Sequence, residues 1–120
     1  MSKRPHEDLK VWRMAMEVVN EIYELTKKFP MNEKYGLVIQ MRRSAISIPS
    51  NIAEGASRHS KSEFVQFLYI ARGSLSELET ELLISLKQGY ISSKRCKTIM
   101  DKTDSVGKML TSLIKRMDKG

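Results

Sequence analysis

The sequence predicts an all-α fold, an up-down-up-down antiparallel four-helix bundle. Four segments repeat apolar residues at spacings of three and four, which is the period of an amphipathic helix. The connections between them are short, and no stretch of any length alternates apolar and polar residues as a strand would. With 120 residues, the chain is expected to form one domain, residues 1–120, with a core of its own.

The first helix is expected over about residues 7–28. The acidic Glu7 and Asp8 suit the positive end of its dipole, and Phe29-Pro30 ends it, because the residue before a proline disfavours helical geometry. At about 100° per residue, the apolar side chains share one broad side: Trp12, Ala15, Met16, Val19, Ile22, Tyr23 and Leu25.

The second helix is expected over about residues 33–54, with Asn32 as its N-cap. Pro49 lies inside it, where it removes one backbone donor and crowds the carbonyl of Ala45, so packing on both sides must hold this helix. Its apolar residues form two stripes, the first with Val38, Met41, Ala45, Ile48 and Ile52, and the second with Ile39, Ile46 and Ala53.

The third helix is expected over residues 61–88. Ser60 and Glu63 form a capping box at its start, and Gly89 suits its C-terminal cap. Its core stripe comprises Phe64, Phe67, Leu68, Ala71, Leu75, Leu78, Leu82 and Leu86, and a second apolar group comprises Val65, Tyr69 and Leu83.

The fourth helix is expected over residues 93–118. A single apolar stripe close to a heptad pattern runs along it, and its other faces are polar. The stripe comprises Cys96, Ile99, Thr103, Val106, Leu110, Leu113 and Met117.

The second and third helices carry more apolar surface than one bundle core needs, and such an excess is typical of an interface. We therefore expect a homo-oligomer, although a wider intramolecular core accounts for the same pattern. The residues expected at the interface are Ile39, Ile46, Tyr69 and Leu83, with the polar residues Arg42, Arg72 and Glu79 beside them.

Arg42 projects between two apolar stripes, which predicts that it is partly buried. A buried guanidinium needs a carboxylate or several carbonyl groups as partners, and Glu79 is the natural candidate. The pair would form within one subunit or between two. A contact between Arg42 and a phosphate is the alternative.

The basic charge predicts attraction to polyanions. The chain has 21 Lys and Arg against 14 Asp and Glu, a formal net charge of +7, and much of the excess lies in the fourth helix. A solvated helix face is the competing interpretation. The expected phosphate-binding residues are Arg43, Arg58, His59, Lys61, Lys94, Arg95, Lys97 and Lys102.

The residues argue against an enzyme. His6 and His59 lack the spacing of metal ligands, there is no glycine-rich phosphate loop, and Cys96 lies on an apolar stripe, where it packs as a small apolar residue. We expect no cofactor and no metal. One cysteine fits a reducing cytoplasm, and neither a signal peptide nor an apolar run of about 20 residues is evident, so no membrane contact is expected.

Several motifs together resemble one known family. They are Asp8 to Trp12, Tyr35 to Leu37, Gln40 to Gly55, Glu63-Phe64, Phe67 to Thr80 and Gly89 to Ile91. In these motifs the chain resembles the four-helix bundle protein family, also called 23S rRNA-intervening-sequence proteins.

The resemblance implies a ring-like homopentamer and a gene that in some members lies inside the large-subunit ribosomal RNA gene. A more distant resemblance is to the accessory proteins of diversity-generating retroelements, which bind a reverse transcriptase and nucleic acid. The family has no established enzymatic activity. Two functions follow as expectations: a homo-oligomer that binds nucleic acid, with RNA favoured, or a scaffold for a nucleic-acid enzyme such as a reverse transcriptase.

Overall fold

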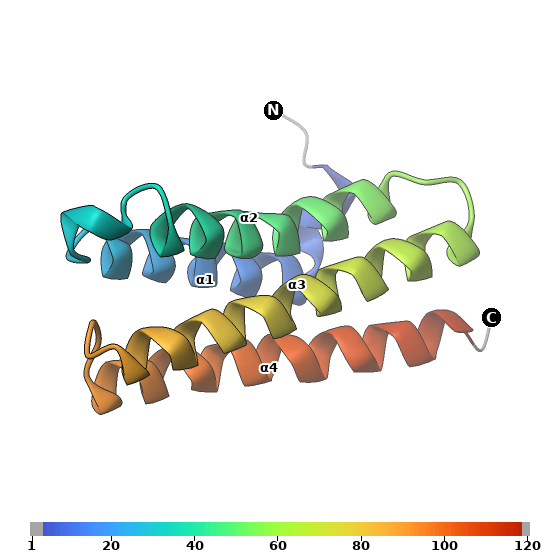
Figure 1. The fold of residues 1–120 in the computed structure, drawn as a ribbon. Coiled ribbons are helices and arrows are strands. Elements are labelled where there is room, and N and C mark those ends of the chain that lie inside the picture. Colours follow the sequence, from blue (N-terminus) through green and yellow to red (C-terminus); the bar gives the residue numbers. More distant parts are fainter. Residues whose placement is uncertain (1–3, 119–120) are drawn as a thin grey trace.

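The computed structural model describes residues 4–118, and the outermost residues of the expected domain, 1–3 and 119–120, lie outside that range. Within it the chain forms a short 3-10 helix, η1 (Pro5–Asp8), then α1 (Lys10–Thr26), a second 3-10 helix, η2 (Met31–Glu33), then α2 (Leu37–Ala56), α3 (Lys61–Lys87) and α4 (Ser93–Asp118). Figure 1 shows the long helices side by side, each running antiparallel to the one before it, so the predicted all-α bundle is confirmed.

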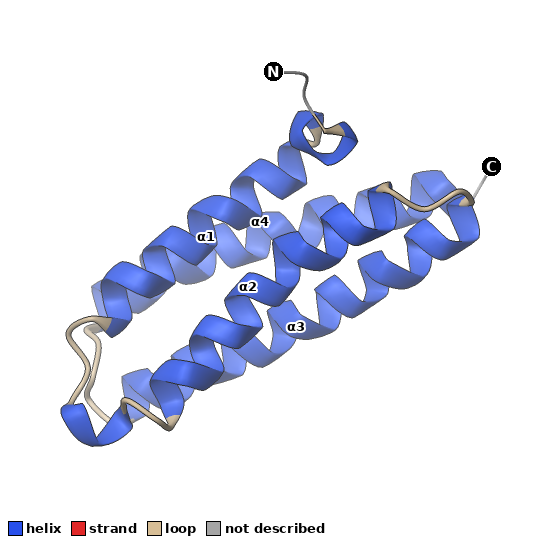
Figure 2. Cartoon of the chain, turned by 90° about the horizontal axis from the view of Figure 1, so that it is seen from above, coloured by secondary structure: helices blue, strands red, loops and turns tan. Residues whose placement is uncertain are grey.

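Each long helix packs against its two neighbours in the order α1, α2, α3, α4 and back to α1, and the α2–α3 contact is the most extensive. Figure 2 shows the α1–α2 and α3–α4 connections together at one end of the bundle and the α2–α3 turn at the other. Within residues 4–118, every helix falls short of the apolar length that a membrane crossing requires.

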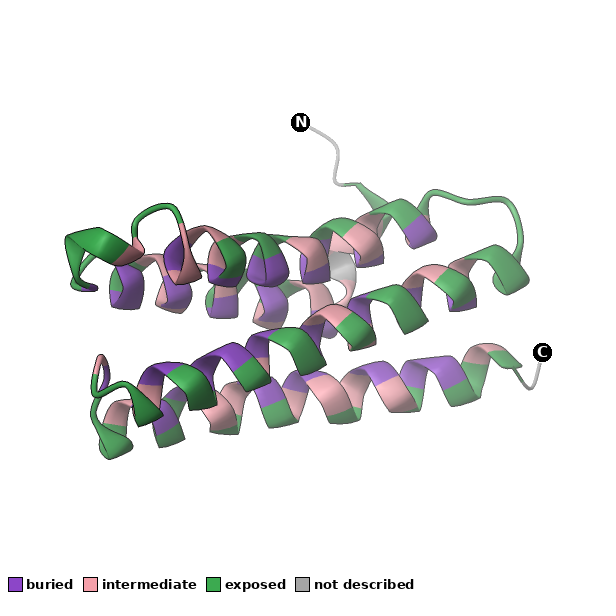
Figure 3. Cartoon of the chain, viewed as in Figure 1, coloured by how far each residue is buried: buried purple, intermediate pink, exposed green. Residues whose placement is uncertain are grey.

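The core is a stripe of buried side chains from each helix (Figure 3). The stripes expected on α2, α3 and α4 supply most of it, and the largest fully buried side chains include Met41, Ile48, Ile52, Leu68, Leu78, Leu82, Ile99 and Leu110. Burial of this apolar surface is the main stabilising term of the fold.

The expected core face of α1 is partly wrong. Val11 and Val18 are buried on α1, whereas Met16 is 44% exposed and Trp12 is only half-buried. The helix carries two overlapping apolar stripes, and the narrower one, with positions 11, 15, 18, 22 and 25, faces α2 and α4. The other stripe lies along the outer edge of the α1–α2 contact, where Met16 lines a hollow with Ile46.

Two expected helix starts are also wrong. Helix α1 begins at Lys10 because Leu9 is extended (φ −77°, ψ 123°) and separates it from η1. Helix α2 begins at Leu37 rather than at residue 33, and Asn32 is not its cap, because the chain first makes the 3-10 turn η2. The Glu33 carboxylate accepts a hydrogen bond from the Leu37 backbone N–H at 3.2 Å and so satisfies one free donor at the start of α2.

The caps predicted for α3 are confirmed at its C-terminus and in part at its N-terminus, where the described residues show one of the two hydrogen bonds of a capping box. The Ser60 hydroxyl accepts a hydrogen bond from the Glu63 backbone N–H at 3.1 Å. Gly89 has a positive φ of 79°, which glycine adopts without steric cost. The Gly89 N–H donates to Leu86 O at 3.0 Å and the Tyr90 N–H to Ser85 O at 2.9 Å, the hydrogen-bond pattern of a Schellman cap.

Candidate nucleic-acid interface

Two of the expected phosphate-binding residues are held by one carboxylate between α1 and α4. Arg95 Nη2 and Lys102 Nζ each lie 2.8 Å from a Glu21 carboxylate oxygen. Hydrogen bonds from Lys102 and then Arg95 lower the pKa of Glu21, and the bond to Glu21 raises the pKa of Lys102. Both cations therefore join α4 to α1, and phosphate would have to compete with Glu21 for them.

A Glu21→Gln variant is expected to lose about 1 kcal/mol of stability at neutral pH, because the amide attracts neither cation and solvent screens partly exposed pairs. A carboxylate with a lowered pKa stabilises the fold above its unfolded-state pKa, and this contribution is lost as the pH falls through the folded-state value. The difference between the two proteins should therefore vanish in acid, below the ordinary pKa of about 4.5.

Urea unfolding of wild type and variant between about pH 7 and pH 3 measures this difference. The comparison with the variant is needed because the stability of wild type alone combines two opposite effects. Burial raises the pKa of Glu81, so protonation of Glu81 stabilises the fold as the pH falls, whereas protonation of Glu21 destabilises it. A difference that stayed constant down to pH 3 would contradict an ionic origin.

Two further candidates are paired on the surface. Arg58 Nη2 lies 2.8 Å from Glu54, and the Arg58 guanidinium stacks on Phe67 at 4.9 Å. Lys97 Nζ lies 3.2 Å from Asp101. These pairs are exposed and each is worth about 0.2–1 kcal/mol, so a phosphate can displace them at little cost.

The remaining candidates are exposed but do not lie together. Arg43 lies on the outer side of α2, and His59 and Lys61 lie at the α2–α3 turn. Lys94 lies in the first turn of α4, at the opposite end of the bundle. The fold thus does not combine the eight expected residues into one surface.

A different set of cations lines one groove, where α1 begins beside the C-terminal half of α4. Helix α1 has 17 residues and α4 has 26, and a groove of about 470 Å³ lies between the start of α1 and the C-terminal half of α4. Its apolar residues are Leu9, Val11, Met109 and Leu113, and its basic residues are Lys10, Lys108 and Arg116.

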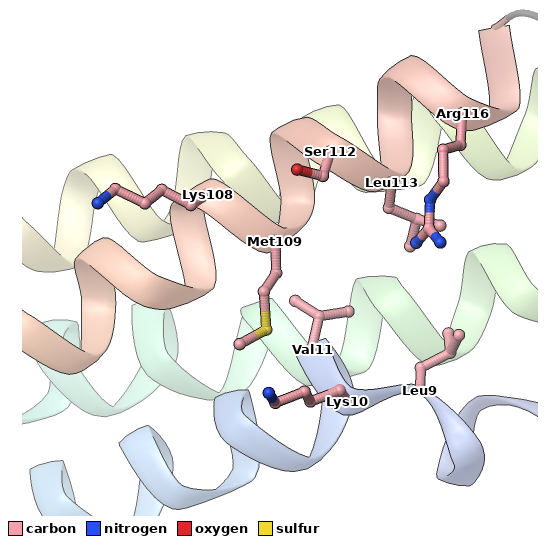
Figure 4. A pocket seen from close by; sticks show the side chains of 8 residues that line it. All are labelled: Leu9, Lys10, Val11, Lys108, Met109, Ser112, Leu113 and Arg116. Carbon is pink, nitrogen blue, oxygen red and sulfur yellow. The ribbon is translucent and has the colours of Figure 1, made fainter.

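Figure 4 shows how these side chains lie: Met109 points across to α1, while Lys108 and Arg116 lie at opposite ends of the groove. Lys10, Lys108 and Arg116 are exposed, and the ion pairs found among the described residues involve none of them. An i,i+4 pair between Asp104 and Lys108, which the sequence favours, is likewise not among them. Among the carboxylates that the structure describes, none therefore competes with an anion for these three cations.

The sequence contains only part of the signal for this groove. Lys108 and Arg116 belong to the basic fourth helix, but Lys10 is separated from them by about a hundred residues and lies on the polar side of the first helix. Only the antiparallel packing of α1 against α4 brings the three together.

Within the chain, Arg42 does not pair with Glu79, so that expectation is wrong for a single subunit. Arg42 Nε donates to Thr26 Oγ1 at 2.9 Å, and its guanidinium lies 4.4 Å from the centre of the Tyr23 ring. Glu79 instead accepts a hydrogen bond from the Thr103 hydroxyl at 2.8 Å. Arg42 faces α1 and Glu79 faces α4, on different sides of the α2–α3 pair.

The other residues expected at an interface are largely exposed. Tyr69 is 46% and Leu83 52% exposed on α3, and Ile46 is 41% exposed on α2, while Ile39 is half-buried. Arg72 stacks on the Tyr69 ring at 4.8 Å and donates a long hydrogen bond of 3.4 Å to Thr111.

The fold and the groove define the class: a basic, all-α four-helix bundle. The chain belongs to the 23S rRNA-intervening sequence protein family, whose sequence model matches residues 7–112, so the resemblance seen in the motifs is confirmed.

One similar solved structure is a crystal structure from Bacteroides thetaiotaomicron VPI-5482, described as a protein of unknown function from the S23 ribosomal protein family. Its sequence is 27% identical to this chain. The match covers 88% of this chain and 98% of the Bacteroides chain, with a TM-score of 0.82. No curated protein matches the chain significantly.

Proposed function

We propose that this chain is a non-enzymatic, homo-oligomeric bundle of the bacterial cytoplasm that binds nucleic acid, RNA in preference, through the α1–α4 groove. The observation that carries the proposal is that Lys10, Lys108 and Arg116 line one groove. Cations that share a concave, partly apolar surface reinforce one another's field more than the same charges spread over a helix.

Phosphate contact needs no fixed base sequence, so the binding should tolerate many sequences and depend strongly on salt. The groove offers aliphatic and thioether side chains rather than aromatic rings, so it provides no stacking platform for single-stranded bases. A double-stranded region, whose backbone presents phosphates in a regular array, therefore suits the groove better than a single strand, and the family description favours structured RNA over duplex DNA. Oligomer symmetry would repeat the groove and strengthen binding through multivalency.

The test compares two double variants with the same change in charge. Lys108→Glu with Arg116→Glu alters the groove, and Lys94→Glu with Lys97→Glu alters the other end of α4. The groove variant is expected to bind a structured RNA at least tenfold more weakly, and the slope of log affinity against log salt should fall by about two because two phosphate contacts are lost. Fluorescence anisotropy across a salt series measures both quantities. Equal losses in the two variants would show that only net charge matters.

A second function, a scaffold or accessory subunit for a nucleic-acid enzyme such as a reverse transcriptase, is favoured by the exposed apolar side chains of α3. Tyr69, Ile70, Leu83 and Ile84 are each 44–52% exposed, and exposed apolar side chains along one helix are a feature of protein interfaces. A neighbouring reverse transcriptase gene and co-purification with its product would support it.

A further inference from the structure

A polar hollow of about 360 Å³ lies on the α2–α3 side of the bundle. Glu77 and Glu81 line it from α3, and Arg43 and Ser44 line it from α2. The two glutamates are one helical turn apart, so their like charges disfavour each other. The nucleic-acid groove lies on the opposite side, between α1 and α4, so the hollow needs an explanation of its own.

The carboxylates in this hollow share a single hydrogen-bond donor among the described residues, the Ser44 hydroxyl. The Ser44 hydroxyl lies 3.3 Å from a carboxylate oxygen of both Glu77 and Glu81, but it has one proton and cannot donate fully to both. Glu81 is only 8% exposed, and its Oε1 is buried without a hydrogen-bond partner among the described residues. Burial and the charge of Glu77 both raise the pKa of Glu81. A buried carboxylate in this state is costly unless a cation or several donors reach it.

Within residues 4–118, no ion pair joins a cation to either carboxylate. Arg43 lines the hollow, yet among the described residues Ser44 is the hydrogen-bond donor to the two carboxylates. The positions above and below them on the same stripe of α3 are Ile70 and Ile84, which are 51% and 44% exposed. The hollow is therefore an acidic site between two exposed apolar side chains.

We propose that this hollow receives a guanidinium or ammonium group from a second copy of the chain, whose apolar surface covers Ile70 and Ile84. Charge complementarity favours this occupant, because the chain has 21 basic against 14 acidic residues and a second copy presents many cations. A free small cation would satisfy the carboxylates but leave the flanking isoleucines exposed. The proposal rests on the homo-oligomer of the proposed function and adds the contact that holds it together.

The test replaces each glutamate with its neutral isostere, Glu77→Gln and Glu81→Gln, with Glu24→Gln on the exposed side of α1 as the matched control. Sedimentation equilibrium without RNA is expected to show an assembly dissociation constant at least tenfold higher for the hollow variants and unchanged for the control. Urea unfolding of the dilute, dissociated protein is expected to show Glu81→Gln at least as stable as wild type, because the amide removes a buried charge that the single chain does not compensate.

Assembly that is unaffected by both glutamine variants would overturn the proposal, and so would a chain that stays monomeric at every concentration. It would also be overturned if agmatine, a free guanidinium compound, stabilised the dilute protein through Glu81 while assembly remained insensitive to Glu81→Gln. These outcomes are distinguishable from a failure of the RNA-binding proposal. The Lys108→Glu and Arg116→Glu double variant should assemble as wild type does, so it can lose RNA binding without any change in the size of the assembly.

Discussion

A chain with alanine in place of Leu82 is expected to lose about 2–5 kcal/mol of unfolding free energy. Leu82 is fully buried on α3, within the apolar cluster to which all four long helices contribute. Truncation removes three heavy atoms and leaves a cavity that well-packed neighbours cannot fill. Since domains of this kind are stable by about 5–15 kcal/mol, the variant should unfold at a much lower urea concentration, as followed by circular dichroism.

The adjacent residue provides the control. Leu83 is 52% exposed, so Leu83→Ala has the same chemistry and almost the same helix position without a cavity. Its unfolding free energy in dilute, monomeric protein should stay within about 0.5 kcal/mol of wild type. Comparable losses in the two variants would mean that α3 turns a different face to the core.

Local signals were sufficient to predict most of α3. The serine at its start and the glycine after its end act through backbone groups within a few residues, so the sequence alone identifies them. The core stripe of α3 was predicted in part from its periodicity. Most of its leucines are buried, but so is Val65 from the second apolar group, whereas Phe64 and Phe67 are only half-buried.

Other features depend on tertiary contacts and were not predictable in the same way. The apolar side of α1 is broad, and its packing against α2 and α4 buries the edge that carries Val11 and Val18. The start of α2 was misplaced because Glu33 caps it from outside the helix. Arg42 found an aromatic ring and a hydroxyl on α1, partners that a search limited to carboxylates does not consider.

The candidate nucleic-acid interface was likewise predictable only in part from the sequence. The sequence indicates which helix is basic, but a cation becomes available to a ligand only if the fold leaves it without an acidic neighbour. Arg95 and Lys102 lie across from Glu21 on α1, whereas Lys108 and Arg116 lie across from Lys10. The distinction depends on the register between α1 and α4, which no local pattern encodes.

The second large effect is expected at Gly55, in the last turn of α2. A Cβ at this position would lie 2.8 Å from the Phe67 Cβ and 3.2 Å from the Phe64 carbonyl oxygen. Both atoms belong to the α3 backbone or are bonded directly to it, so a rotamer change does not relieve the contact. Gly55→Ala should therefore push α2 away from α3 and cost about 1–3 kcal/mol, even though alanine is the better helix former by about 1 kcal/mol.

Gly73 on α3 tests this reasoning, because Gly73→Ala is expected to stabilise the protein rather than destabilise it. It is also inside a helix, but a Cβ there would meet nothing within 4 Å, so in dilute protein Gly73→Ala should gain about 0.5–1 kcal/mol from helix propensity alone. Urea unfolding of both variants under the same conditions separates the two causes. If helix propensity governed both positions, both substitutions would raise the unfolding free energy. A loss at position 55 with a gain at position 73 would mean that the close α2–α3 contact, the most extensive in the bundle, requires glycine at position 55.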